Sequence, residues 1–393
     1  MELADRDFIS SLKIIDSDAH VTEPLDLWTS RLPTKWKDAG PTVFRDDRGI
    51  ERWRLGDVAL TPTALFDVAG WPEYPPSHPP SLEEADPGGW DPKVRLARMD
   101  EYGIYSQVLY PNILGFSSHA FIRLQSRDLQ LACVRAYNEF IVEFASAERN
   151  RLVPIGFLPF WDLDAALDEL RWCKEAGIPG VVFGADFSAV DLPPISDDHW
   201  KPVLGLAEES DISINFHVGF AEIDDAKSDS MLSKRTKASR AANARMFLGT
   251  SAHIADITVN GVCHNFPRLR FVTVESGFGW IPYFVEALDW QWKSSGADLD
   301  YPDRLLPSEY FARQVYGSFW FERGTLALLN GFADNIMFET DYPHATSLTP
   351  GPASVSPLPS QVAADALVGM DKGVVSKVLS TNAASLYGVE LGD

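Results

Sequence analysis

Short apolar runs alternate with longer amphipathic segments along almost the whole chain, and this rhythm restricts the possible folds more than any other feature. Runs such as residues 106–110 (SQVLY) and 180–184 (GVVFG) have the length and composition of buried strands. Segments such as residues 163–176 have the residue spacing of amphipathic helices. About eight strand–helix units can be counted in this way, and eight such units predict a closed barrel of parallel strands.

The individual elements follow from the same pattern. Strands are expected at residues 13–19, 106–110, 152–158, 180–184, 212–218, 270–276, 314–319 and 335–340. Helices are expected at residues 92–103, 125–149, 163–176, 199–209, 241–260, 281–292, 308–313 and 322–332. Gly103 and Gly177 close two of these helices, because glycine adopts the left-handed conformation of a helix end at little cost.

The rhythm is interrupted between residues 29 and 91. Residues 42–55 have the pattern of a hairpin, and residues 71–80 (WPEYPPSHPP) hold too much proline for a helix or a central strand. A long insertion directly after the first strand is expected to lie over the catalytic face as a lid or subunit contact, the alternative being a surface decoration. We therefore expect one domain over residues 1–393, with residues 29–91 as a lid or insertion. A second proline-rich stretch, residues 343–359, is expected to flank the same mouth.

The overall charge and the cysteines restrict the partners and the location of the protein. The chain carries 34 lysines and arginines against 56 aspartates and glutamates, a formal charge of −22, so nucleic acid would be repelled. Its three cysteines are odd in number and far apart, which argues against disulfides and zinc motifs. No stretch is long and apolar enough to cross a membrane, and the N-terminus lacks the features of a signal peptide. We expect a cytoplasmic protein whose partner is a small molecule.

Metal-capable side chains occur at the ends of several expected strands. Asp18 and His20 are two residues apart at the end of the first strand, so their side chains project from the same face. His217, Glu275 and Asp341 end three other apolar runs. A single such residue is often only a helix cap or a hydrogen-bonded core group. Strand ends converge at one mouth of a barrel, however, and together these residues predict a metal site there.

Four segments, IIDSDAHVTEP, INFHVGF, FPRLRFVTVESGFGWIP and MFETDYPH, together resemble the amidohydrolase-related family that includes aminocarboxymuconate semialdehyde decarboxylase. The resemblance spans nearly the whole chain in the expected order, and it implies a distorted (β/α)8 TIM barrel that holds a divalent metal. By position, Asp18 and His20 match the family's first-strand His-x-His pair, and His217 matches the histidine ligand of strand five. Glu275 takes the place of a catalytic histidine of strand six, and Asp341 matches the final aspartate.

Two departures from the family pattern make the candidate site rich in carboxylates. Asp18 and Glu275 stand where the decarboxylases have histidines, Glu23 lies just past the first strand, and His344 follows in DYPH. The candidate metal ligands are Asp18, His20, Glu23, His217, Glu275, Asp341 and His344, of which Glu275 and His344 are also the candidate catalytic residues. Glu23 is alternatively a carboxylate at a helix N-terminus. His344 is alternatively an acid/base or a hydrogen-bond partner of the aspartate.

So many carboxylates around one ion would leave uncompensated negative charge, which a second metal ion would balance. Oxygen-rich ligation with a few imidazoles suits iron or manganese, and the ligand count is that of carboxylate-bridged di-iron proteins. The pattern is similar to that of the amidohydrolase-fold non-heme di-iron monooxygenases of bacterial terpenoid biosynthesis. The first hypothesis is therefore a monooxygenase with two Fe per chain that hydroxylates a bulky apolar substrate, a terpenoid-like acid or thioester. It would use O2 and an external reductant.

Four tryptophans are expected to wall the apolar pocket of an oxygenase, Trp71, Trp90, Trp280 and Trp320.

Other functions remain open. The alternative is a mononuclear hydrolase or decarboxylase with one Zn or Mn, acting on a small carboxylic acid, ester or lactone. The missing strand-six histidine counts against a decarboxylase, since Glu275 does not supply the same cationic assistance at neutral pH. A third hypothesis is a non-catalytic barrel, in which the chelating set would have no purpose. The aromatic-rich insertion favours a homodimer.

Overall fold

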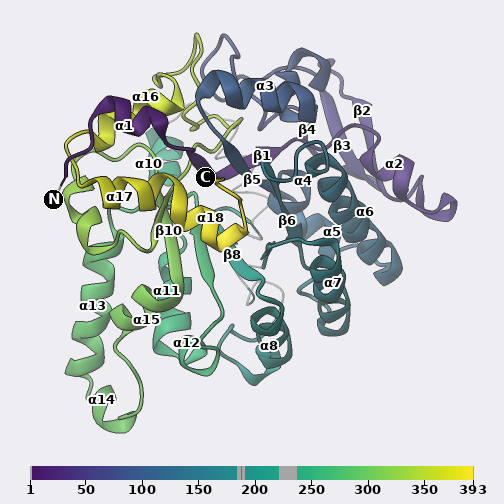
Figure 1. The fold of residues 1–393 in the computed structure, drawn as a ribbon. Coiled ribbons are helices and arrows are strands. Elements are labelled where there is room, and N and C mark those ends of the chain that lie inside the picture. The colour runs from purple at the N-terminus through teal and green to yellow at the C-terminus, as the bar shows by residue number, and fades with distance from the viewer. Residues whose placement is uncertain (1, 184–186, 188–190, 221–236, 393) are drawn as a thin grey trace.

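The computed structural model describes residues 2–183, 187, 191–220 and 237–392, and it confirms the expected (β/α)8 barrel (Figure 1). The barrel strands are β1 (Ile15–Val21), β5 (Ser106–Pro111), β6 (Leu152–Phe157), β7 (Gly180–Val182), β8 (Ser213–His217), β9 (Phe271–Val274), β10 (Val315–Phe319) and β11 (Ile336–Phe338). Each pairs in parallel with the next along the chain, and β1 closes the barrel between β11 and β5.

Helices cover the outside of the barrel (Figure 1). The α-helices are α1 (Arg6–Ser11), α2 (Leu27–Arg31), α3 (Pro92–Tyr102), α4 (Ile113–Phe116), α5 (Ser118–Ile122), α6 (Arg127–Ala145), α7 (Leu163–Ala176), α8 (Lys201–Ser210), α10 (Lys237–Met246), α11 (Ser251–Val259), α12 (Val262–Asn265), α13 (Ile281–Ser294), α14 (Ala297–Asp300), α15 (Pro307–Gln314), α16 (Pro359–Leu367), α17 (Lys372–Ser376) and α18 (Asn382–Tyr387). Short 3-10 helices are η1 (Thr34–Trp36), η2 (Leu82–Glu84), η3 (Pro87–Gly89), η5 (Asp198–Trp200) and η6 (Leu326–Gly331), and η7 (Lys377–Thr381) is a π-helix.

Helix α7 shows how the sequence specifies these units. Its N-cap residue, Asp162, accepts a hydrogen bond from the backbone nitrogen of Ala165, which satisfies one free amide of the first turn. Leu170 and Cys173 are fully buried on the face that packs on the barrel. The helix ends at Gly177, whose φ of 76° is the left-handed conformation expected for a helix-closing glycine.

Most expected elements are confirmed, with some differences at their ends. The helix expected at residues 241–260 is two helices, α10 and α11, because a turn at residues 247–250 interrupts it. The helix expected at residues 322–332 is the 3-10 helix η6. Strands β9 and β11 are shorter than expected, so Glu275 and Asp341 lie in the loops that follow them. Gly184 lies outside the described residues.

The insertion after β1 contains a three-stranded antiparallel sheet made of β2 (Pro41–Arg45), β3 (Glu51–Leu55) and β4 (Val58–Pro62). Strands β2 and β3 are the expected hairpin, and the Asp46 carboxylate accepts hydrogen bonds from two backbone amides of its turn. Strand β4 was not anticipated. The proline-rich residues 71–80 form neither helix nor strand. The role of the insertion as a lid remains a prediction.

The described helices and cysteines bear on two other features of the chain. None of the helices within the described residues has the length and apolar character that a membrane span requires. Cys133, Cys173 and Cys263 are free thiols in the core. Burial raises their pKa above the ordinary value, and thiols with a raised pKa are poor nucleophiles.

Candidate metal centre

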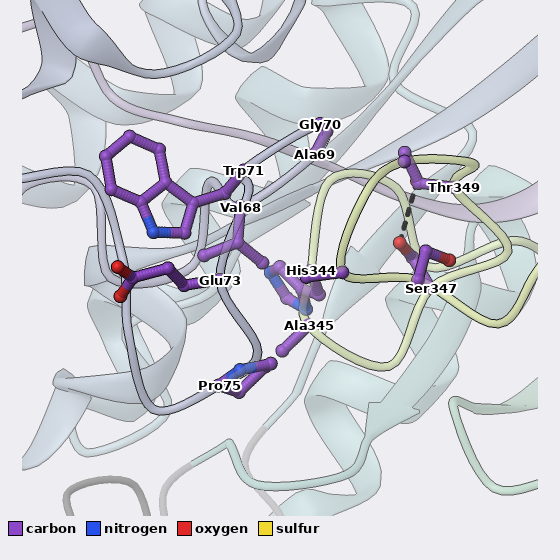
Figure 2. A pocket seen from close by; sticks show the side chains of 13 residues that line it. Val68, Ala69, Gly70, Trp71, Glu73, Pro75, His344, Ala345, Ser347 and Thr349 are labelled. Atoms are coloured by element: carbon purple, nitrogen blue, oxygen red, sulfur yellow. Dashed lines mark hydrogen bonds between the residues drawn. The ribbon is translucent and has the colours of Figure 1, made fainter.

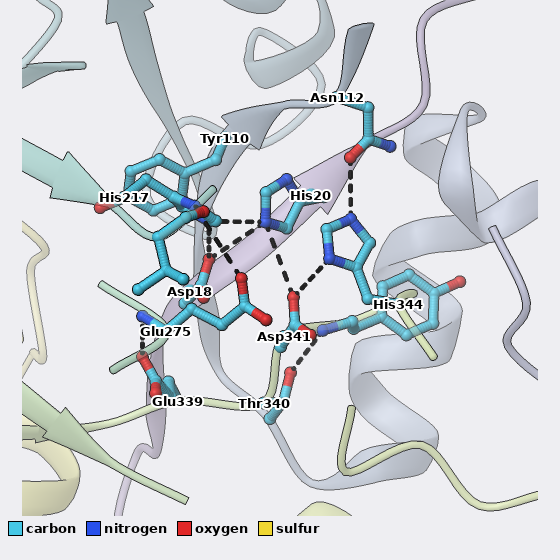
Figure 3. Close-up of polar contacts among 12 residues, drawn as sticks. Asp18, His20, Tyr110, Asn112, His217, Glu275, Glu339, Thr340, Asp341 and His344 are labelled. Atoms are coloured by element: carbon cyan, nitrogen blue, oxygen red, sulfur yellow. Dashed lines mark hydrogen bonds and ion pairs between the residues drawn. The ribbon is translucent and has the colours of Figure 1, made fainter. Parts of the chain in front are cut away.

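Four polar side chains from the carboxyl ends of three strands meet at one mouth of the barrel (Figure 3). Asp18 and His20 come from β1, His217 is the last residue of β8, and Asp341 follows β11. The Nε2 atom of His20 lies 3.5 Å from Oδ1 of Asp18, 3.6 Å from Oδ1 of Asp341 and 2.9 Å from Nε2 of His217. All four side chains are buried. The barrel therefore brings together side chains that lie far apart in the sequence.

The two central histidines present nitrogen lone pairs to each other. Nδ1 of His20 lies 3.1 Å from the carbonyl oxygen of Pro111, and Nδ1 of His217 lies 2.7 Å from that of Val218. Because a carbonyl oxygen only accepts, each Nδ1 carries a proton, and in neutral rings the facing Nε2 atoms are then bare. Among the described residues, neither oxygen of Asp18 has a hydrogen-bond donor. Buried lone pairs without donors are costly, and these donor atoms fit a divalent cation.

The electrostatics of the group also favour a cation. Burial lowers the pKa of His20 well below its usual range. Burial acts in the same direction on His217, but the Asp18 carboxylate outweighs it and raises the pKa of that histidine. The pKa of Asp341 is raised well above its usual range, by burial first and then by Glu275 and Asp18. The site thus disfavours its own negative charges and attracts positive charge.

His344, in the loop after β11, extends the group toward β5. Its Nδ1 atom lies 2.7 Å from Oδ1 of Asp341, and its Nε2 atom lies 2.8 Å from Oδ1 of Asn112. Its ring stacks on that of His20, with centroids 3.9 Å apart. The ligand atoms of Asp18, His20 and His217 lie within 4.8 Å of one another, as do those of His20, Asp341 and His344. These two overlapping groups are the ones that could hold a metal among the residues described.

Glu275 lies beside the group but outside both sets of ligand atoms. Its Oε2 atom is 3.9 Å from Nδ1 of His217, on the side of the ring away from His20. Burial raises the pKa of Glu275 to about 8, so the side chain holds a proton at neutral pH. Glu275 and Asp341 have φ values of 54° and 58°, in the left-handed region that non-glycine residues rarely adopt. Backbone strain of this kind is typical of residues that a functional site fixes in place.

Glu23 also lies outside both sets of ligand atoms in the described structure. Its Oε1 atom accepts hydrogen bonds from the backbone nitrogens of Asn112 (3.1 Å) and Ile113 (2.9 Å), at the start of α4. This is the alternative that the sequence left open, a carboxylate at a helix N-terminus. Burial raises its pKa to about 7. The geometry thus gives Glu23 a capping contact where a metal contact was expected.

Two buried carboxyl groups that support the site were missed from the sequence. Asp16 accepts hydrogen bonds from the backbone nitrogen (2.8 Å) and hydroxyl (2.6 Å) of Thr340 and from Nε2 of Gln107 (2.8 Å). It therefore ties β1 to the chain that leads to Asp341. Glu339 accepts a hydrogen bond from the backbone nitrogen of Glu275 (3.2 Å). An acidic residue within or directly after an apolar run was the signal for both.

Phenylalanines, rather than the expected tryptophans, surround the histidines. The ring of Phe220 stacks on His217 with centroids 4.0 Å apart, and Phe116 lies 5.8 Å from His20. Phe66, from the insertion, lies 5.5 Å from His344. Three of the tryptophans pack elsewhere, Trp90 against a small cluster of the insertion, Trp280 against Phe284, and Trp320 against Phe247 and Phe321.

A small cavity that is partly open to solvent lies next to His344 (Figure 2). Its walls come from residues 68–75 of the insertion and from residues 344–354 after β11. Trp71 is the one expected tryptophan that lines it. The two proline-rich stretches therefore flank the same opening.

Comparisons with known proteins agree on the family. The family model described as amidohydrolase matches residues 15–389. The gamma-resorcylate decarboxylase of Rhizobium sp. (strain MTP-10005) is 24% identical over 258 residues, which cover 64% of this chain and 76% of that protein. An amidohydrolase from Mycobacterium avium subsp. paratuberculosis K-10 has a similar structure, with a TM-score of 0.75 and 20% identity over 96% of this chain and 100% of that one. A dihydroxybenzoic acid decarboxylase from Polaromonas sp. JS666, solved with bound manganese, has a TM-score of 0.60 and 18% identity over 96% of this chain and 97% of that one.

The expectation of a monooxygenase with two iron ions is therefore wrong. The Rhizobium relative is a decarboxylase, and so is the Polaromonas protein that was solved with manganese. The expectation rested on surplus carboxylates that would need a second ion. In the structure backbone amides donate to Glu23, and burial raises the pKa of Glu23, Glu275 and Glu339, which lowers the negative charge of the group.

Proposed function

Because the chain belongs to the amidohydrolase family, we propose that it is a decarboxylase that uses one divalent metal ion and acts on an aromatic carboxylic acid. The observation that carries this proposal is a set of buried metal-ligating atoms at one point of the barrel mouth. The Nε2 atoms of His20 and His217 face each other at 2.9 Å, and the Asp18 oxygens beside them lack a hydrogen-bond donor among the described residues. The relatives named above are the reason for choosing decarboxylation within the family.

Asp18, His20, His217 and Asp341 would hold the metal, which is manganese or zinc. Two imidazoles and two carboxylates suit either ion. When bound, the metal supplies a positive charge that fixes the carboxylate of the substrate and stabilises the electrons left on its ring. The backbone carbonyls of Pro111 and Val218 keep both imidazoles in the tautomer with bare Nε2 atoms.

Glu275 is the proposed proton donor. When a carboxylate leaves as CO2, the carbon that carried it must receive a proton. Glu275 lies beside His217 and is protonated at neutral pH, because its burial disfavours the charged form. A protonated Glu275 can supply this proton without the positive charge of a histidine, because the reaction needs a proton and not a permanent cation.

The substrate is expected to enter through the cavity beside His344. Trp71 offers an aromatic wall there, and Phe66 and Phe116 lie behind it around the histidines. No lysine or arginine occurs among the described residues that line the cavity. A substrate carboxylate would therefore find its positive partner at the metal.

The proposal is tested with protein stripped by a chelator and reloaded with Mn²⁺ or Zn²⁺. We expect release of CO2 from gamma-resorcylate or another hydroxybenzoic acid, no activity after stripping, and about one metal ion per chain. Glu275→Gln should retain the metal and lose turnover by a factor of about 100 or more. Hydrolysis of esters or lactones with no release of CO2 from any acid would contradict the proposal.

A further inference from the structure

A chain of hydrogen bonds runs from the insertion to His344. Oδ2 of Asp67, in the insertion, accepts from the hydroxyl of Thr22 at 3.2 Å. The same hydroxyl oxygen accepts from Nδ2 of Asn112 at 3.3 Å, and Oδ1 of Asn112 faces Nε2 of His344 at 2.8 Å (Figure 3). All four side chains are buried. Thr22 and Asn112 take no part in the proposed chemistry, so this chain of hydrogen bonds needs another explanation.

The insertion is packed so that Asp67 reaches this position. A Cβ atom at Gly89 would lie 1.9 Å from Oδ2 of Asp67, so only glycine leaves room for the carboxyl group. The carbonyl of Gly89 accepts from the backbone nitrogen of Thr22 at 2.9 Å, and the backbone nitrogen of Val68 donates to the carbonyl of Pro343 at 3.1 Å. The insertion is thereby attached on one side to the end of β1 and on the other to the loop that carries His344.

Each link of the chain fixes the direction of the next. Thr22 has a single hydroxyl proton, and when Asp67 accepts it the oxygen of Thr22 can only accept from Asn112. The amide of Asn112 then has its nitrogen toward Thr22 and its oxygen toward His344. An oxygen that only accepts requires a proton on Nε2 of His344, and the 2.7 Å contact between Nδ1 of His344 and Oδ1 of Asp341 requires a second proton on one of those two atoms. Without Asp67 or the hydroxyl of Thr22, the side-chain amide of Asn112 is free to rotate by half a turn, which exchanges the positions of its oxygen and nitrogen.

We propose that Asp67 is a positioning residue that acts through Thr22 and Asn112 to orient the ring of His344, with Nε2 of His344 as the donor to Asn112. Through these hydrogen bonds the insertion sets the orientation of the His344 side chain, which lines the cavity. Only the kinetic consequence of this inference rests on the proposed function. The hydrogen bond from Nε2 of His344 to Asn112 is a property of the protein itself. Oδ2 of Asp67 accepts from Thr22 when the carboxyl group is ionised and also when its proton is on Oδ1, which has no hydrogen-bond partner among the described residues.

Substitutions of two buried threonines, Thr22 and Thr63, provide matched variants for a test of this chain of hydrogen bonds. Thr22→Val removes the hydroxyl with little change of shape, and Thr22→Ser restores it. Thr63→Val removes another buried hydroxyl of the insertion, one that donates to Glu51 at 2.9 Å and has no part in the chain. We expect kcat of Thr22→Val to fall on the order of tenfold with KM nearly unchanged, whereas Thr22→Ser and Thr63→Val stay within about twofold of the wild type. Asp67→Ala should match Thr22→Val, and the double variant should be no worse than either.

The second readout is independent of turnover. ¹⁵N-labelled histidine in the zinc-loaded protein reports which ring nitrogen carries a proton, and the signals of His344 are those that disappear in His344→Gln. We expect an Nε2–H signal in the wild type, Thr22→Ser and Asp67→Asn, and its loss in Thr22→Val and Asp67→Ala. An unchanged signal in folded Thr22→Val or Asp67→Ala would overturn the inference. If the signals behave as expected while no acid is decarboxylated, the proposed reaction fails and the positioning role stands.

Discussion

Asp18 and Glu23 are two buried carboxylates at the same end of β1, and their partners distinguish their roles. Neither oxygen of Asp18 has a donor among the described residues, whereas Oε1 of Glu23 accepts from two backbone amides of α4. A buried carboxylate without donors is stable only next to a cation or in its protonated form. We therefore assign the metal contact to Asp18 and the capping contact to Glu23.

This assignment predicts opposite results for two matched substitutions. Asp18→Asn removes the charge that holds the metal, and we expect the metal affinity to fall by a factor of about 10 to 100 or more. Glu23→Gln keeps an oxygen that accepts from the amides of Asn112 and Ile113, and we expect the metal to be retained. Metal content after dialysis, measured by mass spectrometry, compares the two. Loss of metal from Glu23→Gln with retention in Asp18→Asn would reverse the assignment.

The buried side chain of Asp67 should make the stability of the protein depend on pH. Burial, followed by the nearby Asp86, raises its pKa from 3.8 to about 8 in the folded protein. Between these values the folded protein holds a proton that the unfolded chain has released, so the free energy of unfolding falls as pH rises through this window. From pH 7 to 9 this one group removes about 1.4 kcal/mol.

Asp67→Asn cannot ionise, so its free energy of unfolding should fall less than that of the wild type over the same range. Urea denaturation of both proteins at pH 7 and pH 9 measures the difference. Equal losses in the two proteins would show that Asp67 is already ionised at pH 7 in the folded state.

At the scale of elements, α4 and the end of β8 hold each other in place through glycines. A Cβ atom at Gly115, in α4, would lie 2.4 Å from the ring of Phe220, which stacks on His217. A Cβ atom at Gly219 would lie 3.1 Å from Phe116, the ring next to His20. Each phenylalanine therefore lies against a glycine of the other segment, and both rings support a histidine of the site.

Gly115→Ala should displace Phe220 and disturb His217. We expect a loss of stability of about 1–3 kcal/mol together with weaker metal binding, because a well-packed core does not accept an additional methyl group without strain. Gly205→Ala, in helix α8, is the matched control, since its Cβ would meet only Phe266 at 3.7 Å, an ordinary van der Waals contact. That change should stabilise the protein by about 0.5–1 kcal/mol. Chemical denaturation measures both, and a Gly115→Ala protein as stable as Gly205→Ala would contradict the packing argument.

At the scale of the whole molecule, the proposed metal joins elements from opposite ends of the chain. Strand β1 pairs with β11, and the backbone nitrogen of Asp341 donates to the carbonyl of Asp18 at 2.8 Å, so the first and last strands of the barrel share one site. The unfolded chain cannot assemble these ligands. A metal that binds only the folded protein stabilises it through that difference.

Chelation should therefore lower the thermal midpoint, and Mn²⁺ should restore it. At a free metal concentration about 100 times the Kd, the stabilisation is about 2.7 kcal/mol. Differential scanning calorimetry of stripped and reloaded protein measures it, with Asp18→Asn as the control that should not respond. A wild-type midpoint that is the same with and without metal would show that no ion binds at this site.

The barrel and most of the candidate site residues could be predicted from the sequence. Apolar runs specify strands because each barrel strand is buried on both faces, and glycines such as Gly103 and Gly177 end helices through local backbone preferences alone. Both effects act over a few residues, so they can be predicted from neighbouring positions. The family resemblance, which rests on residues around Asp18, His217 and Asp341, is also a property of the sequence.

The charge of the site could not be predicted from the sequence, because it depends on contacts between distant segments. Whether a carboxylate binds a metal, caps a helix or keeps its proton depends on which amides and charges lie within a few ångströms. Those partners come from distant segments, as Asn112 does for Glu23 and His217 does for Glu275. The number of carboxylates in the sequence therefore favoured two iron ions, whereas the burial and hydrogen bonds of these groups reduce the negative charge that a metal must balance.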